Sequence, residues 1–514
     1  MENQCQEDSI LKLIIAEKPS VAKSIASALG ASSRADGFYE GSGLLVSWCV
    51  GHLVSPMDAG GYDENFKKWR YDDLPILPEP FRYVLAPGKE DAFENLRALM
   101  NRPDVDTIVN ACDAGREGEL IFRLVYEMTG CRKPVLRLWI SSMEDSAIRE
   151  GFSDLRPGAD YEALYQSALC RQKADWLVGI NATRLFSVLY HRTLNVGRVQ
   201  TPTLAMLADR DVKITLFHKE KYHLLRLTLD GAEAVSEKFT DPAEAEQAAA
   251  MCKGAAVTCT SVTKEQKKEQ PPKLYDLTTL QREANRLFGY TAKQTLDYAQ
   301  SLYEKKLLTY PRTDSRYLTS DMEETASCVI HLVAKLPPFD GCGNFFPLVE
   351  AMSSDKDVSD HHAIIPTMEI EKADIKALPL GERNLFLLVC CKLLCASAEP
   401  YVYEAVTVTF DCGGHSFTAK GKCILSEGWR EIDRIFRASL KERPADEDGG
   451  TLPDFTEGQT FDGAEVAVTE HFTQPPKPYT EDTLLSAMEN ADKDDIPDEA
   501  ERKGLGTPAT RAAI

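Results

Sequence analysis

Tyr310 and Arg312 stand two positions apart, an arrangement that suits a nucleophilic reaction on an anionic group. A phenol has a pKa of about 10, so it needs nearby positive charge to favour the phenolate and to neutralise an anionic target. Pro311 biases Tyr310 towards an extended conformation, which lets residues 310 and 312 point the same way. A planar guanidinium also suits a phosphodiester. The pattern therefore predicts Tyr310 as a nucleophile and Arg312 as its partner. On its own, Tyr-x-Arg more often marks a half-buried aromatic at a helix end followed by a solvated charge.

Three acids follow two predicted strands, which supplies a second group of reactive residues. Glu17 comes after the apolar run 11–16, and Asp113 and Glu117 come after the run 107–112. Helical patterns follow both runs, and such βα units favour a parallel sheet whose ligands gather beyond the carboxyl ends of its strands. The three carboxylates thus predict an Mg²⁺ site. The alternative is that these acids only cap the helices that follow.

Glu17 has a second candidate role. A carboxyl group held near other carboxylates has a raised pKa, and it can then protonate the departing sugar oxygen when a phosphodiester is cut. Lys18 and Arg116 stand beside the acids in the sequence and are the candidate phosphate clamps.

The charge distribution decides whether nucleic acid is a plausible partner. The net charge of −21 argues against it, but residues 441–500 hold 17 acidic and 4 basic residues and so account for −13 of the total. Residues 166–201 hold 5 basic and 1 acidic, and residues 271–320 hold 8 basic and 5 acidic. Tyr310 therefore lies in a locally basic segment, where phosphate binding is favoured.

Length and composition predict three or four domains in a cytoplasmic protein. The 514 residues include no run of eighteen apolar residues, and residues 1–9 are polar and acidic. The 14 cysteines form no Cys-x-x-Cys pair, which predicts reduced thiols without structural zinc. Cys390, Cys391 and Cys395 fit a helix core. No Gly-x-x-x-x-Gly-Lys-Ser/Thr loop is present, which fits a reaction that does not require ATP.

The elements alternate in type along the chain. Residues 10–150 read as strand and helix in turn, with a further strand at 135–140, and residues 160–210 read as helical. Residues 217–262 are strand-like, residues 263–272 form a charged linker ending in proline, and residues 273–400 are helix-rich. Strand-like patterns return at 403–410 and 464–469, on either side of an acidic stretch that includes 445–450. This order suggests one domain interrupted by another.

Taken together, these segments resemble the type IA DNA topoisomerases, most closely the bacterial topoisomerase III branch. The similarity runs through nearly the whole chain in the family's order. The matching stretches are 13–29, 48–53, 109–130, Arg171 to Arg184, 195–204, 277–285, 302–303, 309–315, 361–367 and 504–511.

The resemblance implies a multidomain α/β and α+β fold that forms a toroidal clamp around a hole. Its parts would be a Toprim α/β domain at 1–150, domain IV at 151–215 with 478–514, β-rich domain II at 216–272 with 401–477, and helical domain III at 273–400. Domain III would carry Tyr310 and meet the Toprim acids across an interface.

The resemblance also implies the reaction. Tyr310 would attack single-stranded DNA to form a 5′-phosphotyrosine, Arg312 and Lys18 would stabilise the transition state, Glu17 would protonate the leaving oxygen, and Mg²⁺ would rest on Glu17, Asp113 and Glu117. His361 would hold a phosphate or serve as a structural hydrogen-bonder. The residues expected to contact DNA are Arg116, Arg171, Asp175, Arg184, Arg198, Gln200 and Thr201. Tyr303 and Trp176 are weaker stacking candidates that fit a core better.

Two features depart from the family. The acidic motif Asp-x-Asp-x-Glu here has glycine at its middle acid, Gly115, and we expect cleavage to survive because Tyr310, Arg312 and Glu17 do not depend on it. The chain also stops at Ile514, inside a segment that in the family continues as helix, so it looks like a piece of a longer protein.

The resemblance further predicts a monomer that acts on single-stranded and underwound duplex DNA in the bacterial cytoplasm, with nucleoid or plasmid DNA. Its action would relax negative supercoils and unlink DNA circles. Two rivals remain: another Toprim phosphotransferase such as a primase or nuclease, and a catalytically silent single-strand clamp.

Overall fold

The computed structural model describes residues 11–229, 231–342, 347–358, 361–440, 452–463, 465–491 and 504–514. The polar segment 1–9 and the acidic stretch 445–450 lie outside them. Within the described residues, no helix is long and apolar enough to cross a membrane.

The N-terminal part is built on a sheet of seven strands in the order β2-β3-β4-β1-β7-β8-β9. Its strands are β1 (Leu11–Ala16), β2 (Ser33–Ala35), β3 (Phe38–Gly41), β4 (Leu44–Trp48), β7 (Val105–Ala111), β8 (Val135–Arg137) and β9 (Arg156–Pro157). The four central strands β4, β1, β7 and β8 run parallel, as the βα pattern predicts. The strand expected at 135–140 ends earlier, at Arg137.

Helices cover both faces of this sheet, which explains why its central strands are apolar throughout. Helices α3 (Glu90–Met100) and α4 (Arg116–Thr129) pack on one face, and α1 (Pro19–Leu29) and α5 (Asp145–Ser153) on the other. Helix α1 begins with a proline in its first turn and ends at Gly30, whose φ of 82° is left-handed.

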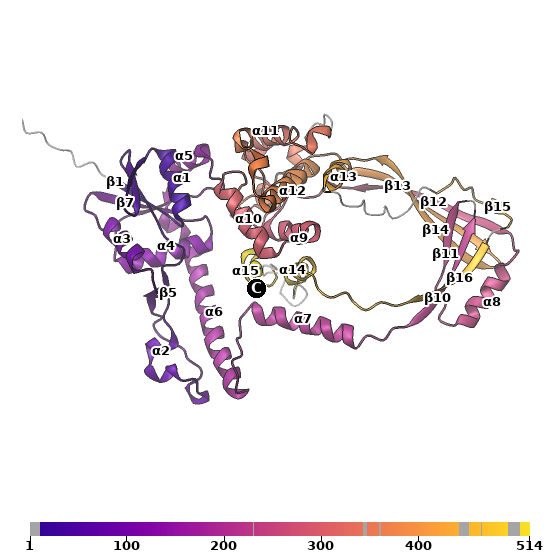
Figure 1. Ribbon diagram of the computed structural model, residues 1–514, viewed down its shortest axis with the longest axis horizontal. Coiled ribbons are helices and arrows are strands. Elements are labelled where there is room, and N and C mark those ends of the chain that lie inside the picture. The colour runs from indigo at the N-terminus through magenta and orange to yellow at the C-terminus, as the bar shows by residue number, and fades with distance from the viewer. Residues whose placement is uncertain are drawn as a thin grey trace, which may run out of the picture.

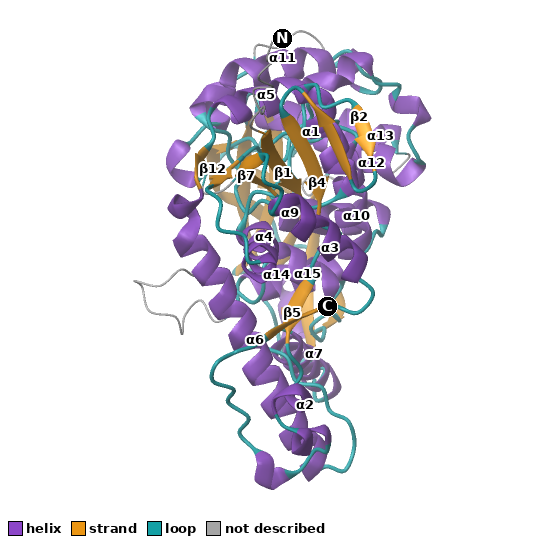
Figure 2. Ribbon diagram, turned by 90° about the vertical axis from the view of Figure 1, so that its left-hand side faces the viewer, coloured by secondary structure: helices purple, strands orange, loops and turns teal. Residues whose placement is uncertain are grey.

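A long helix leads away from the sheet. Helix α6 (Glu162–Leu189) runs down to the lower end of the molecule, beside α2 (Ala59–Tyr62), as Figure 2 shows. The segment that carries α2 leaves and rejoins the N-terminal part through the paired strands β5 (Val54–Pro56) and β6 (Tyr83–Leu85). Helix α7 (Gln200–Thr215) then leads towards the β-rich part.

The β-rich part is a second sheet of seven strands, in the order β15-β12-β13-β14-β11-β10-β16. Its elements are β10 (Lys221–Leu229), β11 (Ala232–Ser236), α8 (Pro242–Cys252), β12 (Val257–Glu269), β13 (Tyr401–Cys412), β14 (His415–Ser426), β15 (Thr460–Phe461) and β16 (Glu465–Phe472). Chain segments on both sides of the helical block thus pair in one sheet, as an interrupted domain requires.

Two expectations for this part are wrong. The predicted linker 263–272 is mostly strand, because β12 continues to Glu269 and pairs with β13 from Thr263↔Thr407 to Glu269↔Tyr401. Its charged side chains are largely exposed, and the partner strand satisfies its backbone. Within the strand-like region 217–262, residues 242–252 form helix α8, since an alanine-rich segment favours helix.

The helical block matches its predicted character. It contains α9 (Leu277–Phe288), α10 (Ala292–Glu304), α11 (Glu323–Val333) and α12 (Leu380–Ala396), and α13 (Trp429–Ser439) packs on the same core. Cys390, Cys391 and Cys395 are buried on α12, as expected. The short helices α14 (Glu481–Glu489) and α15 (Pro508–Ala513) pack against α9 and α10.

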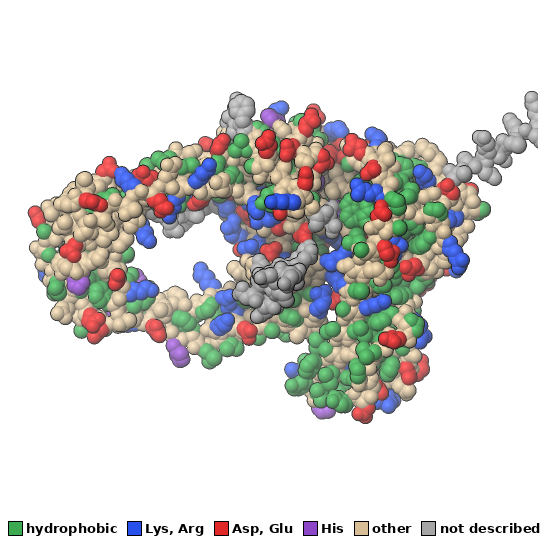
Figure 3. All heavy atoms as spheres, turned by 180° about the vertical axis from the view of Figure 1, so that it is seen from behind, with side chains coloured by type: hydrophobic (Ala, Val, Ile, Leu, Met, Phe, Trp, Pro, Cys, Tyr) green, Lys and Arg blue, Asp and Glu red, His purple; other side chains and the backbone are tan. Residues whose placement is uncertain are grey.

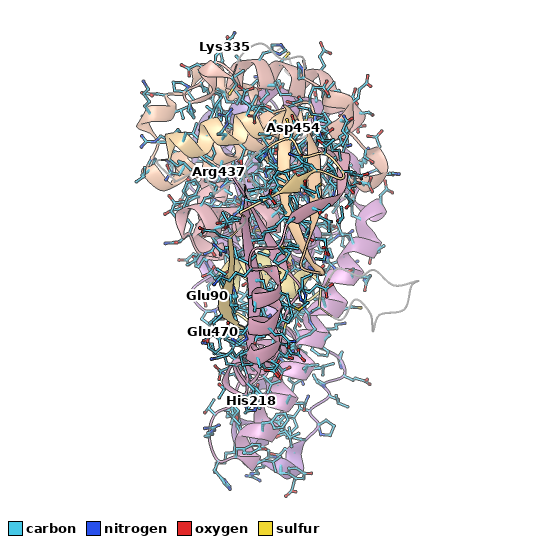
Figure 4. The ribbon with its side chains drawn as sticks, turned by 90° about the vertical axis from the view of Figure 1, so that its right-hand side faces the viewer. Glu90, His218, Lys335, Arg437, Asp454 and Glu470 are labelled. Atoms are coloured by element: carbon cyan, nitrogen blue, oxygen red, sulfur yellow. The ribbon has the colours of Figure 1, made fainter. Side chains whose placement is uncertain are left out.

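These parts enclose a hole (Figure 1). Helix α7 lies below it, β10 and β16 lie at its far end, β12 and β13 pass above it, and α9 and α14 lie on the side of the N-terminal part. Figure 3 shows the same opening in the atomic surface, with Lys and Arg side chains on several sides. In Figure 4, seen from the β-rich end, His218 between α7 and β10 lies in the lower half, and Asp454 lies in the upper half.

Candidate active site

The acids meet at one edge of the first sheet. Strands β1 and β7 are adjacent and parallel, with Ala16 opposite Ala111, so the residues that follow them emerge together. Helix α4 begins at Arg116, and its first turn packs against the backbone of Asp113. A Cβ added at Gly118 would lie 2.1 Å from the Asp113 carbonyl oxygen, so glycine is required for this close approach.

Arg137 holds the turn that carries Asp113. Its fully buried guanidinium donates to the carbonyl oxygens of Asn110 at 3.0 Å, Cys112 at 2.8 Å and Asp113 at 2.9 Å. Glu119 balances the charge, with its Oε2 3.3 Å from the Arg137 Nε. A buried cation is tolerated when it is paired and hydrogen-bonded. This pair was not predicted from the sequence, where one arginine in an apolar strand is its signal.

Tyr310 lies against these acids although it comes from the helical block. Its hydroxyl donates a hydrogen bond to Asp113 Oδ2 at 3.2 Å, and its amide donates to the Ser141 carbonyl oxygen at 3.0 Å. The side chain is 6% exposed, and its ring packs edge-on against Tyr303 with centroids 5.3 Å apart. Tyr303 is itself buried, which fits a core role better than base stacking.

The phenol of Tyr310 is protonated in this arrangement. Burial raises its pKa well above the ordinary value, the Asp113 carboxylate raises it further, and Arg312 opposes both. The expectation that positive charge would favour the phenolate therefore does not hold in the DNA-free protein, because burial and Asp113 outweigh the guanidinium.

Arg312 is exposed and lies beside the cluster formed by Tyr310 and the three acids. Its charge acts on Glu17 and Glu117 and lowers the pKa of each, so it lies beside the acids as its spacing from Tyr310 predicts. Among the residues that the structure describes, Arg312 makes no hydrogen bond or ion pair.

Glu17 and Glu117 differ in their surroundings. Burial, followed by the Asp113 charge, raises the pKa of Glu17 to about 7, against the influence of Arg312, Lys18 and His52. Glu117 is exposed and accepts a hydrogen bond from His52 Nε2 at 2.8 Å, which lowers its pKa. In the described part of the chain, no three Asp, Glu, His or Cys side chains gather closely enough to enclose an ion.

His361 links the helical block to the turn that follows β7 and carries Asp113. Its Nε2–H donates to the Ala114 carbonyl oxygen, which can only accept, so its Nδ1 accepts from the Ser141 hydroxyl at 2.9 Å. Its ring lies 4.5 Å from that of Tyr310 and stacks on Trp139 at 5.9 Å. Burial lowers its pKa to about 4, so the ring is neutral. This geometry favours the structural role that the sequence left open.

Comparison with known proteins agrees with this arrangement. A family model described as DNA topoisomerase matches residues 159–514, and a Toprim domain model matches residues 12–143. The chain is 40% identical over 521 residues to DNA topoisomerase 3 of Bacillus subtilis, an alignment covering 98% of this chain and 71% of the relative. DNA topoisomerase 3 of Shouchella clausii is 39% identical over 528 residues, with the same coverage.

The chain belongs to the type IA DNA topoisomerases. The resemblance to the bacterial topoisomerase III branch is thereby confirmed, and the protein is an isomerase. A solved structure of full-length topoisomerase I from Thermotoga maritima shares the fold, with a TM-score of 0.72 at 24% identity, covering 98% of this chain and 77% of that one. The toroidal fold predicted for this topoisomerase is confirmed.

Gly115 takes a backbone conformation that few other residues adopt. Its φ is 154° and nothing lies within 4 Å of an added Cβ, so a side chain has room but strains the backbone. In this topoisomerase the glycine precedes Arg116, which is half-buried at the start of α4.

Most of the predicted DNA contacts lie along α6 and the start of α7. Arg198 pairs with Asp175 at 2.6 Å, and Arg171 donates to Thr510 on α15 at 3.1 Å. Gln200 and Thr201 are exposed at the start of α7. Arg171 is near enough to lower the pKa of Glu117, so this line of polar groups reaches the acids.

Arg184 is separate from that line. It is 7% exposed, donates to the Phe66 carbonyl oxygen at 2.7 Å, and lies 5.6 Å from the Trp69 ring centroid. Trp176 likewise packs between Tyr62 and Phe81. Both residues lie on α6 and hold against it the segment that carries α2, between β5 and β6.

Proposed function

We propose that Tyr310 cleaves and rejoins single-stranded DNA in this topoisomerase through a 5′-phosphotyrosine. The observation that carries the proposal is the buried hydrogen bond between the Tyr310 hydroxyl and Asp113, which joins the helical block to the Toprim acids. The linkage keeps the energy of the broken phosphodiester, so no ATP is needed to rejoin the strand.

The proposed cleavage step balances within the site. Tyr310 Oη forms a bond to phosphorus while the bond from phosphorus to the 3′ oxygen breaks. Asp113 Oδ2, which already accepts the hydroxyl, takes the phenol proton. Glu17, with its pKa raised to about 7, gives a proton to the leaving 3′ oxygen. Religation reverses each transfer.

Two cations are proposed to bind the reacting phosphate. Arg312 makes no hydrogen bond or ion pair with the described residues, and it offers a planar set of donors to a phosphodiester. Lys18 adds a second positive charge. Charge held in place before the reaction stabilises the negative transition state of phosphoryl transfer.

Mg²⁺ is the proposed cofactor, and the chemistry of the site fits it. Mg²⁺ takes one or two carboxylates and completes its shell with water and phosphate oxygens, so Asp113 and Glu117 suffice without a third protein ligand. Glu17 was also predicted as a ligand, but its raised pKa fits a proton donor better. When bound, the ion would neutralise phosphate charge near Tyr310.

Strand passage requires the helical block to part from the Toprim domain. Besides the Tyr310 and His361 contacts, Lys306 Nζ lies 2.5 Å from Asp145, and the Met368 amide donates to Glu144 at 3.1 Å. The buried Tyr303 and Tyr310 rings add apolar packing against the Toprim core, so these polar and apolar contacts must break together when the interface opens. The four-domain division set out from the sequence remains our proposal for the moving parts.

The proposed setting is a monomer acting on single-stranded and underwound duplex DNA in the bacterial cytoplasm. The proposed outcome is relaxation of negative supercoils and unlinking of DNA circles. Primases, nucleases and silent clamps do not form a tyrosyl–DNA linkage, so that linkage separates the proposal from its rivals.

A labelled single strand tests the function. Incubation with Mg²⁺ followed by denaturation is expected to leave label on the wild-type protein and none on Tyr310→Phe, with Tyr317→Phe as a matched control that retains the adduct. An adduct that persists in Tyr310→Phe would overturn the proposal.

A further inference from the structure

Glu304 is the last residue of α10, and its carboxylate crosses to the start of α1 in the Toprim domain. Its Oε1 lies 3.4 Å from Lys18 Nζ, and its Oε2 accepts a hydrogen bond from the Ser20 hydroxyl at 3.3 Å. Gln300, one turn earlier on α10, donates to Oε1 at 3.1 Å. The Lys18 and Glu304 side chains are 29% and 30% exposed, so a solute can reach the contact.

The groups around this carboxylate are those that bind a phosphate. An ammonium group, a hydroxyl group and the first turn of a helix converge on it, and helix N-termini favour anions. Lys18 is the N-cap of α1 and also the proposed phosphate clamp. In this structure Lys18 holds the carboxylate of Glu304 from the helical block instead.

We propose that Glu304 is an internal anion that occupies Lys18 in the closed, DNA-free protein and that a DNA phosphate displaces. The inference rests on the proposed role of Lys18. An exposed ion pair is weak in water, so a competing phosphate replaces it readily. The exchange has a second effect, because freeing Glu304 removes one of the contacts that hold the helical block on the Toprim domain. DNA loading thereby favours opening.

Equilibrium binding of a labelled single-stranded oligonucleotide tests this exchange. The Tyr310→Phe protein serves as background, so that binding is measured without cleavage. Glu304→Gln keeps the shape of the side chain and an acceptor for Ser20 but removes the charge. We expect about two- to fivefold tighter binding at low salt. The plot of log K against log salt should steepen by about 0.7, since one more cation becomes free to neutralise phosphate.

Two matched variants make the test specific. Asp297→Asn removes one negative charge from the same helix, where Asp297 pairs locally with Lys293 at 2.8 Å, and it should leave the salt slope unchanged. In a Lys18→Ala background, Glu304→Gln should have no effect, because the cation it releases is absent.

The contrary results are distinct. Unchanged binding in Glu304→Gln, or an equal gain in Asp297→Asn, would overturn the exchange. Weaker binding would also overturn it, since Glu304 would then position Lys18 on the phosphate rather than compete for it. If Lys18→Ala alone leaves binding unchanged, it is the phosphate role of Lys18 that fails.

Discussion

The hydroxyl of Tyr310 lies 3.2 Å from Oδ2 of Asp113, although 197 positions separate the two residues. One hydrogen bond thus joins the proposed nucleophile on the helical block to an acid of the Toprim sheet. In the proposed mechanism, parting the helical block from the Toprim domain for strand passage therefore also separates Tyr310 from Asp113.

Replacing Asp113 tests its role as proton acceptor. Asp113→Asn keeps the shape but removes the acceptor charge, and at saturating Mg²⁺, which offsets any weaker metal binding, the single-turnover cleavage rate should still fall about 10²- to 10⁴-fold. Asp106→Asn, an exposed position on the same strand β7, is the control and should cleave like the wild type. Cleavage by Asp113→Asn within threefold of wild type would count against the role.

The raised pKa of Glu17 predicts a pH dependence of cleavage. A carboxyl group with a pKa of about 7 carries its proton below that value and loses it as the pH rises through 7. Single-turnover cleavage should therefore decline from pH 6 to pH 8, and Glu17→Gln should be slow with no such decline. A wild-type rate that is constant over this range would contradict the assignment.

The neutral His361 predicts how the closed interface responds to acid. Its pKa of about 4 lies below the ordinary value of 6.5, so the open state binds a proton first. The contact is fully present above pH 6.5 and is lost as the pH falls through 4. Imidazole chemical shifts should show His361 unprotonated at pH 5.5; a titration midpoint near 6.5 would be incompatible with the buried ring.

Arg137 should matter for stability as well as activity. Arg137→Met removes the buried cation beside Glu119 and the donor to four carbonyl oxygens, a change that costs about 3–5 kcal/mol for a buried pair. Thermal unfolding of the variant should start at a lower temperature, and cleavage should be lost. Arg132→Met, at an exposed position, is the control. A wild-type melting profile in Arg137→Met would refute this account of the turn.

Gly115→Asp restores the acid that the family motif usually carries, and Gly115→Ala controls for backbone strain at φ 154°. An added carboxylate should lower the Mg²⁺ concentration that gives half-maximal cleavage, and the alanine variant should not. Cleavage by the unmodified glycine protein should itself be measurable. An identical Mg²⁺ dependence in all three would exclude a metal role for this position.

The sequence predicted the features that depend on local hydrophobic pattern and chain order. The apolar runs before Glu17 and Asp113 predicted the parallel strands and the shared sheet edge, because hydrophobic pattern and chain order determine both. It misled at β12, where a charged segment forms a strand through pairing with β13, a partner more than a hundred residues away in the chain. Long-range pairing of this kind overrides local composition.

The contacts of the supporting residues could not be predicted from the sequence, because they too depend on long-range packing. Arg137, Ser141 and His52 act through groups that folding brings to them, and nothing in their own neighbourhoods signals those partners. The direction of the Tyr310 pKa shift also depends on burial, which the Tyr-x-Arg spacing does not reveal.

The most direct test of the central claim is the identity of the residue and of the DNA end in the covalent product. Wild-type protein is allowed to cleave a single strand, the adduct is digested with protease and nuclease, and the remaining peptide is analysed by mass spectrometry. The proposed cleavage by Tyr310 should give a nucleotide linked through its 5′ phosphate to the peptide containing Tyr310, with a free 3′ hydroxyl on the released strand. A nucleotide on any other residue, or a 3′ linkage, would contradict it.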